Sequence, residues 1–279
     1  GEHDERRTYH ASLHDLEEAA RRYARQARTL VACADWAGLD DLLAGHPDRV
    51  RYGESPGADY RIDDLRLAPD RTRFTLRGPD AAVPVQLAVP GRYNAHNAAA
   101  ALAAAHRAGV TLADAAEALA TFTGVGRRWQ RWGEIDGALV IDDYAHHPTE
   151  VTATLEAALA TGRRVRAVLQ PHRWVRTARH WPALADAVAV ADEVLVVDVF
   201  GAGETEIPGV SSERIVQRLR DGGHTAAHHD LASAGRYLAG SLASGDLVIT
   251  LGAGDVWRVA QALVQGSPVD GPTPGPKVG

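Results

Sequence analysis

Two polar clusters, residues 142–150 and 170–177, each follow a short run of β-branched residues and precede an amphipathic stretch. The first reads Asp-Asp-Tyr-Ala-His-His-Pro-Thr-Glu and the second reads Gln-Pro-His-Arg-Trp-Val-Arg-Thr. This placement predicts that both clusters lie at the carboxyl ends of neighbouring parallel strands, where open α/β sheets bind their ligands. Carboxylates, imidazoles and guanidinium groups are poor core material, so we interpret the two clusters as parts of one site.

The first cluster combines groups that bind sugars and phosphates with groups that exchange protons. An aspartate at this point can accept hydrogen bonds from ribose hydroxyls, and a histidine can hold a phosphate or exchange a proton near neutral pH. A helix cap with a solvated loop is the alternative, but six functional side chains within nine positions favour a site. A two-histidine metal site is a third interpretation, disfavoured because the adjacent His146 and His147 would diverge.

The second cluster offers two arginines three residues apart, Arg173 and Arg176. A guanidinium group suits the bidentate capture of a carboxylate or phosphate because its donors form a planar fork. An ordinary solvated helix start is the alternative. Cations at a helix N-terminus oppose the helix dipole, however, so an anion held between them would resolve the conflict. We therefore favour anion binding here.

Three other segments carry weaker indications. Arg127 and Arg128 lie in a glycine-containing linker, from which they can reach a ligand held between domains. Asn94 and Asn97 begin an alanine-rich helix and can bond a purine edge, although Asn94 is equally suited to capping that helix. Residues 251–255 hold only two of the three glycines of a dinucleotide fingerprint, which favours a tight strand-to-helix turn.

Length and composition predict a two-domain globular protein. The 279 residues carry a net charge of −6, which argues against nucleic-acid binding, and no run is long enough for a membrane span or resembles a signal peptide. A single cysteine, Cys33, gives no reason to expect an oxidising compartment, so we predict a cytoplasmic protein. Methionine is absent, and the only lysine, Lys277, lies in the Pro/Gly-rich tail 266–279, which we predict to be disordered.

Hydrophobic patterning changes character at residues 122–128, which we predict to be the inter-domain linker. Residues before it predict helices at 94–107 and 112–121 and strands at 29–34, 62–67, 73–77 and 83–89. Residues after it predict strands at 138–143, 164–170, 193–199, 225–229 and 246–251, alternating with helices at 148–160, 177–190, 211–221, 231–242 and 255–264. Such alternation is typical of an α/β fold with a doubly wound, mostly parallel sheet.

Five motifs in this order resemble the Mur ligases. They are the two clusters, Gly126-Arg127-Arg128, the segment 90–97, and the segment 199–204, and together they extend the resemblance over about residues 1–264. Residues 147–150 together with 170–173 resemble the alanine-adding branch of the family.

The resemblance implies the last part of a central ATPase domain at 1–123, a Rossmann-like amino-acid-binding domain at 124–265, and a tail at 266–279. It implies a cytoplasmic, ATP- and Mg²⁺-dependent ligase of peptidoglycan synthesis that joins L-alanine to UDP-N-acetylmuramate through an acyl phosphate. The Gly-Lys-Thr phosphate loop of the family is absent, so the chain is expected to lack the family's N-terminal part and to be inactive alone.

The resemblance also implies roles for individual residues. Asn94 and Asn97 would contact adenine, Asp143 would hold the ribose, and Arg127 would reach the phosphates. Six side chains would line the substrate side, without a decision on which contacts the amino acid: Tyr144, His146, His147, His172, Arg173 and Arg176. Catalytic roles are expected for Arg127, His146 and His172.

The predicted Mg²⁺ ligand is His3, with Glu5 as the alternative because an alignment without gaps puts Glu5 at that position. Tyr93 stands where the family usually has histidine, so the adenine contacts can differ from the family's.

Other functions remain open at this point. A murein tripeptide ligase acting on the same nucleotide sugar is the nearest enzyme. A non-catalytic nucleotide-binding module, a metal-dependent hydrolase built on Asp143, His146 and His147, and an NAD oxidoreductase are the other classes, in decreasing order of support. The patterns do not predict an oligomeric state.

Overall fold

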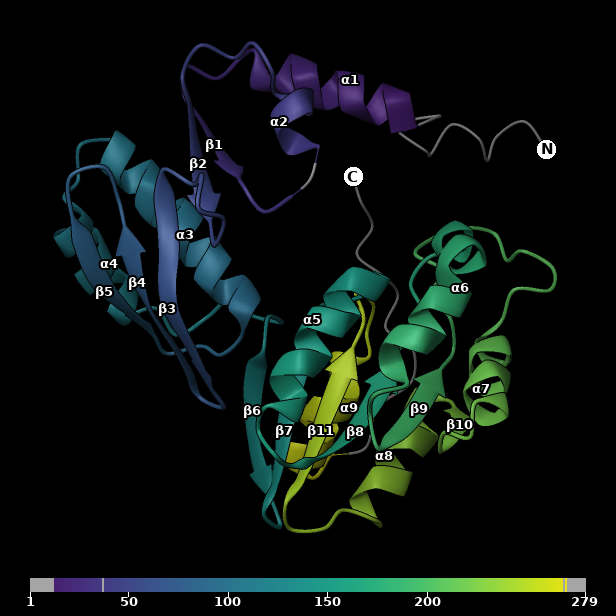
Figure 1. Cartoon of the computed structure of the whole chain (residues 1–279). Helices are drawn as coiled ribbons and strands as arrows, with labels where there is room; N and C mark the ends of the chain where they lie inside the picture. The colour runs from purple at the N-terminus through teal and green to yellow at the C-terminus, as the bar shows by residue number, and fades with distance from the viewer. Residues whose placement is uncertain (1–12, 37, 268, 270–279) are drawn as a thin grey trace. The chain divides into compact units, whose positions relative to one another are not determined.

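The chain divides into two compact units, Gly1–Thr123 and Gly124–Gly279 (Figure 1). The computed structural model describes residues 13–36, 38–267 and 269. Most of the tail 266–279 therefore lies outside the described residues. Within them, no helix has both the length and the apolar character that crossing a membrane requires.

The first unit contains a five-stranded sheet in the order β1-β2-β3-β4-β5. The first three strands run parallel, and the last two pair antiparallel. The strands are β1 (Leu30–Cys33), β2 (Arg49–Gly53), β3 (Tyr60–Ala68), β4 (Arg71–Arg77) and β5 (Ala82–Leu87). The helices are α1 (Leu13–Ala24), α2 (Leu39–Leu42), α3 (Arg92–Arg107) and α4 (Leu112–Ala120).

The core of the first unit forms between the apolar face of the sheet and the apolar face of α3. Strand β5 alternates, with Val83, Val85 and Leu87 buried, as half-buried strands do. Helix α3 buries a face rich in alanine, which lets the helix lie close to the sheet, and Leu102 fills the remaining space.

The second unit contains a six-stranded sheet in the order β10-β9-β8-β11-β7-β6. All neighbours pair parallel except β6, which is antiparallel to β7 at the edge. The strands are β6 (Gln130–Ile135), β7 (Ala138–Asp143), β8 (Arg164–Leu169), β9 (Glu193–Val197), β10 (Ala226–His229) and β11 (Asp246–Leu251). The helices are α5 (Pro148–Leu159), α6 (Trp174–Val188), α7 (Ser212–Asp221), α8 (Leu231–Ala239) and α9 (Trp257–Gln265).

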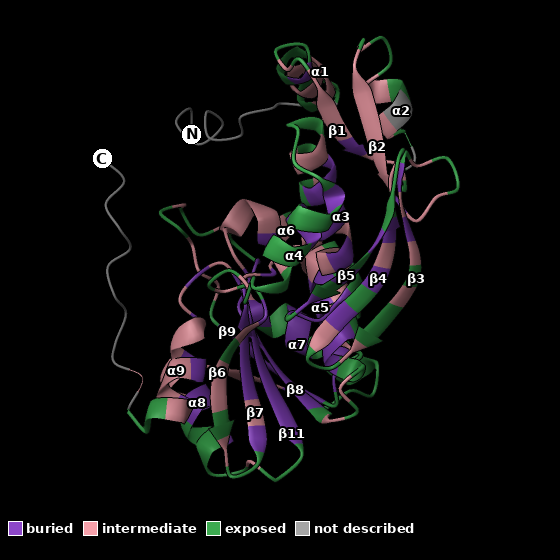
Figure 2. Ribbon diagram, turned by 90° about the vertical axis from the view of Figure 1, so that its left-hand side faces the viewer, coloured by how far each residue is buried: buried purple, intermediate pink, exposed green. Residues whose placement is uncertain are grey.

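Helices cover both faces of the second sheet, so its central strands are apolar on both sides. Ile141 and Ile249 join the core beneath α5, α6 and α7, whereas Val140 and Val248, one residue away in each strand, join the core beneath α8 and α9. Figure 2 shows the central strands in the colour of buried residues. The predicted doubly wound α/β fold is confirmed.

Two strands were not predicted. Strand β2 carries Arg49 and Arg51 and is only half-buried over most of its length. Strand β6 is an edge strand that contains Gly133 at φ +158°, beside a register shift between Arg131 and Gly133. Neither strand has the β-branched run or the clear alternation that marks the other strands.

One cluster of charges is buried near the amino ends of β8, β9 and β11. Arg166 is 1% exposed and donates from Nε to Glu193 at 2.6 Å, while its terminal nitrogen lies 3.4 Å from Asp246. The same guanidinium donates to the backbone oxygen and the hydroxyl of Ser241 at 2.9 and 2.8 Å. A buried charge is tolerated when it is paired and hydrogen-bonded in this way.

Candidate active site at the carboxyl edge of the second sheet

The two polar clusters follow β7 and β8, whose carboxyl ends lie at the same edge of the sheet. The prediction that these two strands are neighbours is wrong. Strand β11 lies between them and pairs with both. The loops nevertheless bring His146 and His172 together, with ring centroids 5.6 Å apart. One site of imidazole and guanidinium groups therefore spans the ends of three parallel strands.

Histidines 146 and 172 have different hydrogen-bonding environments. The Nδ1 of His146 lies 2.9 Å from the carbonyl oxygen of Tyr144, so Nδ1 carries the proton and Nε2 remains a proton acceptor. The Nδ1 of His172 faces a guanidinium nitrogen of Arg176 at 3.5 Å, and its ring stacks on Phe200. That guanidinium makes Nδ1 an acceptor in His172 and places the proton on Nε2.

Burial keeps both imidazoles neutral. It lowers the pKa of His146, and it lowers the pKa of His172 to about 4, with repulsion from His146 in its protonated form and from Arg176 and Arg173 acting in the same direction. Neutral imidazoles at physiological pH can take a proton from a reacting group, which a protonated ring cannot do.

We expect the protein to lose stability as the pH falls from about 6.5 toward about 4, because the unfolded chain binds a proton in this window that folded His172 does not. His172→Gln should reduce this loss. The measurement is the urea midpoint at about pH 7 and about pH 5. An equal pH dependence in both proteins would contradict the expectation.

Arg173 is committed to a partner within the protein. It lies immediately before α6 with φ +67°, and its backbone N–H donates to the carbonyl oxygen of Phe200 at 2.8 Å. Its side chain donates from Nε to Glu204 at 2.6 Å, and Glu204 is nearly buried. The arginine therefore anchors the start of α6 to the loop after β9.

Arg176 differs from Arg173 because no carboxylate of the described residues neutralises it. It lies half-buried in the first turn of α6, where its guanidinium contacts the His172 ring. A guanidinium that faces neutral imidazoles and no carboxylate is suited to bind a carboxylate or phosphate from a ligand.

The Tyr144 ring lies beside two guanidinium groups, those of Arg127 at 5.0 Å and Arg128 at 5.3 Å from the ring centroid. Its edge meets the His146 ring at a centroid distance of 5.5 Å. These contacts extend the site from the histidine pair toward the start of the unit. Arg128 is exposed, which leaves its guanidinium accessible to a ligand.

Arg127 was predicted to reach phosphates, and in this structure three of the five N–H donors of its side chain are engaged within the protein. Its Nε donates to the buried carboxylate of Asp142 at 3.0 Å, and its terminal nitrogens donate to the carbonyl oxygens of Gly254 and Gly252 at 2.8 and 2.6 Å. Asp142 also accepts from the Thr250 hydroxyl at 2.6 Å. The arginine thus joins the start of the unit to β7 and to the loop after β11.

Asp143, predicted to hold a ribose, is 2% exposed and accepts two backbone hydrogen bonds. One oxygen accepts from the Trp129 amide at 2.7 Å and the other from the Ala145 amide at 2.8 Å. Burial raises the pKa of both Asp142 and Asp143. Each carboxylate oxygen keeps a second lone pair, but the side chain is almost inaccessible to a ligand in this structure.

His147 serves as the cap of α5. Its Nδ1 accepts from the Thr149 amide at 3.3 Å, and Glu150 accepts from the backbone amides of His147 and His146 at 3.1 and 3.0 Å. Its ring contacts His180 at a centroid distance of 5.1 Å. His147 is therefore a helix cap, the alternative considered for this loop, whereas the His146 ring faces the His172 ring.

The remaining predicted residues lie elsewhere. Asn94 and Asn97 are in the first turns of α3 in the first unit, where the Asn94 side chain donates to the carbonyl oxygen of Pro90 at 2.7 Å and Asn97 is exposed. His3 and its alternative Glu5 lie outside the described residues. Phe200 and Glu204 were not predicted as site residues, although both lie in the motif 199–204 that contributed to the family resemblance.

Comparisons with known proteins agree on one family. The family model for the glutamate ligase domain of Mur ligases matches residues 127–254. A UDP-N-acetylmuramate–L-alanine ligase from Deinococcus radiodurans is 45% identical over 264 residues, covering 93% of this chain and 55% of the relative. A relative of the same name from Streptomyces coelicolor is 42% identical over 258 residues, covering 88% and 55%.

Among solved structures, the UDP-N-acetylmuramate–alanine ligase MurC from Thermotoga maritima matches with a TM-score of 0.75 and 25% identity. The match covers 92% of this chain and 55% of that structure. The chain thus spans about half the length of the curated relatives it matches.

Proposed function

The chain belongs to the Mur ligase family, and on that premise we propose that it is the carboxy-terminal part of an enzyme that joins L-alanine to UDP-N-acetylmuramate. ATP converts the muramoyl carboxylate to an acyl phosphate, and the amine of alanine displaces phosphate from it. The observation that carries the proposal is the position of Arg176 beside two neutral imidazoles, since an amino acid needs a cation for its carboxylate and a base for its ammonium group.

We assign the carboxylate of alanine to Arg176 rather than Arg173, because Arg173 already pairs with Glu204. Nε2 of His146 takes a proton from the ammonium group, which frees the nitrogen lone pair for attack on the acyl carbon. Nε2–H of His172 donates to the alanine carboxylate or to the oxygen that becomes negative as the amine adds. Collapse of that tetrahedral intermediate re-forms the carbonyl and breaks the bond to phosphate, and the departing phosphate carries away the second proton that the nitrogen loses.

The nucleotide roles follow the family resemblance. We propose that residues 1–123 are the last part of an ATP-binding domain, with Asn94 and Asn97 contacting adenine, and that residues 124–265 receive the amino acid. Asp143 holds the ribose, and Arg127 offers phosphates the second N–H of each terminal nitrogen, whose first N–H donates to a backbone carbonyl. Bound Mg²⁺ would neutralise phosphate charge, and its predicted ligand, His3, lies outside the described residues.

Tyr144 and His147 complete the proposed substrate side, Tyr144 through its ring and His147 by shaping the loop as the cap of α5. The site of action is the cytoplasm, where ATP and nucleotide-linked sugars are available.

Phosphate release by the full-length protein that carries this sequence tests the proposal. With ATP and UDP-N-acetylmuramate present, L-alanine should stimulate release, and murein tripeptide should not. The chain alone should release none, because it has no Gly-Lys-Thr phosphate loop. Stimulation by tripeptide instead of alanine would establish the murein tripeptide ligase as the function, and no stimulation by either would reject a ligase.

A further inference from the structure

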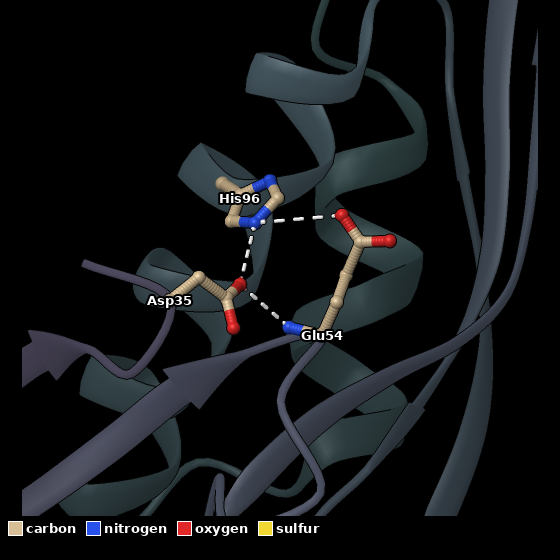
Figure 3. A group of neighbouring side chains, drawn as sticks. All are labelled: Asp35, Glu54 and His96. Carbon is tan, nitrogen blue, oxygen red and sulfur yellow. Dashed lines mark hydrogen bonds and ion pairs between the residues drawn. The ribbon is translucent and has the colours of Figure 1, made fainter. Parts of the chain in front are cut away.

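Three side chains that play no part in the proposed ligation meet in the first unit. Asp35 follows β1, Glu54 follows β2, and His96 lies in the first turns of α3 (Figure 3). Strands β1 and β2 are parallel, so their carboxyl ends bring the two carboxylates to one edge of the sheet. Nε2 of His96 lies 2.9 Å from Asp35 and 3.7 Å from Glu54, and one ligand atom from each residue lies within 4.8 Å of the others.

We propose that Asp35, Glu54 and His96 form a binding site for one divalent transition-metal ion of the Mn²⁺ or Zn²⁺ type.

The Asp35 carboxylate is fixed in position before any ion binds. It accepts hydrogen bonds from the backbone amides of Glu54 and Ser55 at 2.7 and 2.8 Å and from the Ser55 hydroxyl at 2.5 Å. Partial burial opposes its ionisation, but these bonds and the one to His96 hold the pKa of Asp35 at about 2. Gly53, at φ +148°, permits the close approach, because a Cβ there would collide with this carboxylate.

The orientation of His96 is that of a metal ligand. Its Nδ1 lies 3.1 Å from the backbone oxygen of Arg92, so Nδ1 carries a proton. This hydrogen bond fixes the ring and leaves Nε2 to face the carboxylates. Metal-bound histidines commonly use their second nitrogen in this way. Nε2 then points at the carboxylates of Asp35 and Glu54, and a cation placed between the three groups would contact all of them.

The donor set and its spacing define the class of ion. One imidazole nitrogen with two carboxylate oxygens suits ions that accept both nitrogen and oxygen ligands. Mg²⁺ and Ca²⁺ are disfavoured, because they prefer oxygen ligands alone. Ligands about 2.1 Å from a tetrahedral ion lie roughly 3.4 Å apart. The separations of 2.9 and 3.7 Å from Nε2 bracket that value. All three side chains are partly exposed, so water can complete the coordination.

Arg92 competes with the ion. Its guanidinium donates to both oxygens of Glu54, and Arg92 is 55% exposed while Glu54 is 33% exposed. Binding an ion requires Glu54 to turn from Arg92 toward Nε2 of His96. Removing the arginine side chain should therefore strengthen ion binding, whereas removing the charge of Glu54 should weaken it.

These opposite effects define the test, a titration of the full chain with Mn²⁺ followed by the electron paramagnetic resonance of the free ion. We expect one Mn²⁺ whose affinity falls about tenfold or more in Glu54→Gln and rises roughly two- to fivefold in Arg92→Gln. Zn²⁺ should displace Mn²⁺ from it, since affinities rise along that series. Circular dichroism confirms that each variant is folded.

His228→Gln is the matched control. His228 also lies between two carboxylates, but Asp198 faces its Nε2 at 2.9 Å and Glu213 faces its Nδ1 at 3.5 Å, so the two cannot share one ion with a single ring nitrogen. Its Mn²⁺ affinity should equal that of the unmodified chain. If Mn²⁺ does not bind, or binds equally to the unmodified chain, Glu54→Gln and Arg92→Gln, the cluster is a protonated ion-pair network and the proposal is wrong.

Discussion

Arg176→Ala in the full-length protein is expected to lower kcat/KM for L-alanine by roughly 10²- to 10³-fold, the usual effect of truncating one partner of a desolvated charge pair. The reason is that the Arg176 guanidinium lies beside His172 and faces no carboxylate of the described residues, so it is available to a ligand. Loss of the Arg176 guanidinium leaves the alanine carboxylate without a positive partner. The measurement is steady-state phosphate release with alanine as the varied substrate.

The matched control is Arg179→Ala, which removes the same charge from an exposed position three residues further along α6. Its kcat/KM should stay within about twofold of the parent, because exposed charges are screened by solvent. KM for ATP should be unchanged in both variants, which separates amino-acid binding from nucleotide binding. Equal losses in both variants would show that only the net charge of the helix matters.

Arg166→Met is expected to destabilise the second unit by about 3–5 kcal/mol, the range found when one partner of a buried ion pair is removed. Methionine occupies much of the same volume, but Glu193 and Asp246 then remain as buried carboxylates whose nearest cation is the half-exposed Arg164, at 3.8 and 3.9 Å. Urea unfolding followed by tryptophan fluorescence reports this unit, because five of the six tryptophans of the chain follow Gly124.

Arg164→Met provides the comparison within the same strand. Arg164 lies 3.8 Å from Glu193 and 3.9 Å from Asp246, but its side chain is 53% exposed. Its loss should cost no more than about 1 kcal/mol. A similar loss of unfolding free energy in the two variants would mean that burial of Arg166 does not determine how much it stabilises the unit.

The strand ends that carry the candidate site could be predicted because β-branched runs mark buried parallel strands, and polar residues directly after them must lie at one edge of the sheet. Their order in the sheet could not, since nothing local in β11 indicates that it inserts between β7 and β8. The half-polar edge strand β6 escaped prediction because an edge strand needs only one apolar face.

The use of each arginine could not be predicted from spacing either. Arg173 and Arg176 look equivalent in the sequence, yet Arg173 pairs with Glu204, which lies 31 residues away. Arg166 breaks the apolar pattern of β8, and its explanation lies in Glu193 and Asp246, which the fold brings together from 27 and 80 residues away. Charged partners distant in sequence leave no local pattern.

The attachment of Arg127 limits where the connection between the two units can twist. Its carbonyl oxygen accepts from the Tyr144 amide at 2.7 Å, its side chain is tied to Gly252 and Gly254, and Val125 forms a bridge with Arg128. Upstream, the Phe122 amide still bonds the end of α4. Thr123 and Gly124 lie between these two anchored ends, and a proline at Gly124, whose φ is +109°, would force this short stretch into another backbone conformation.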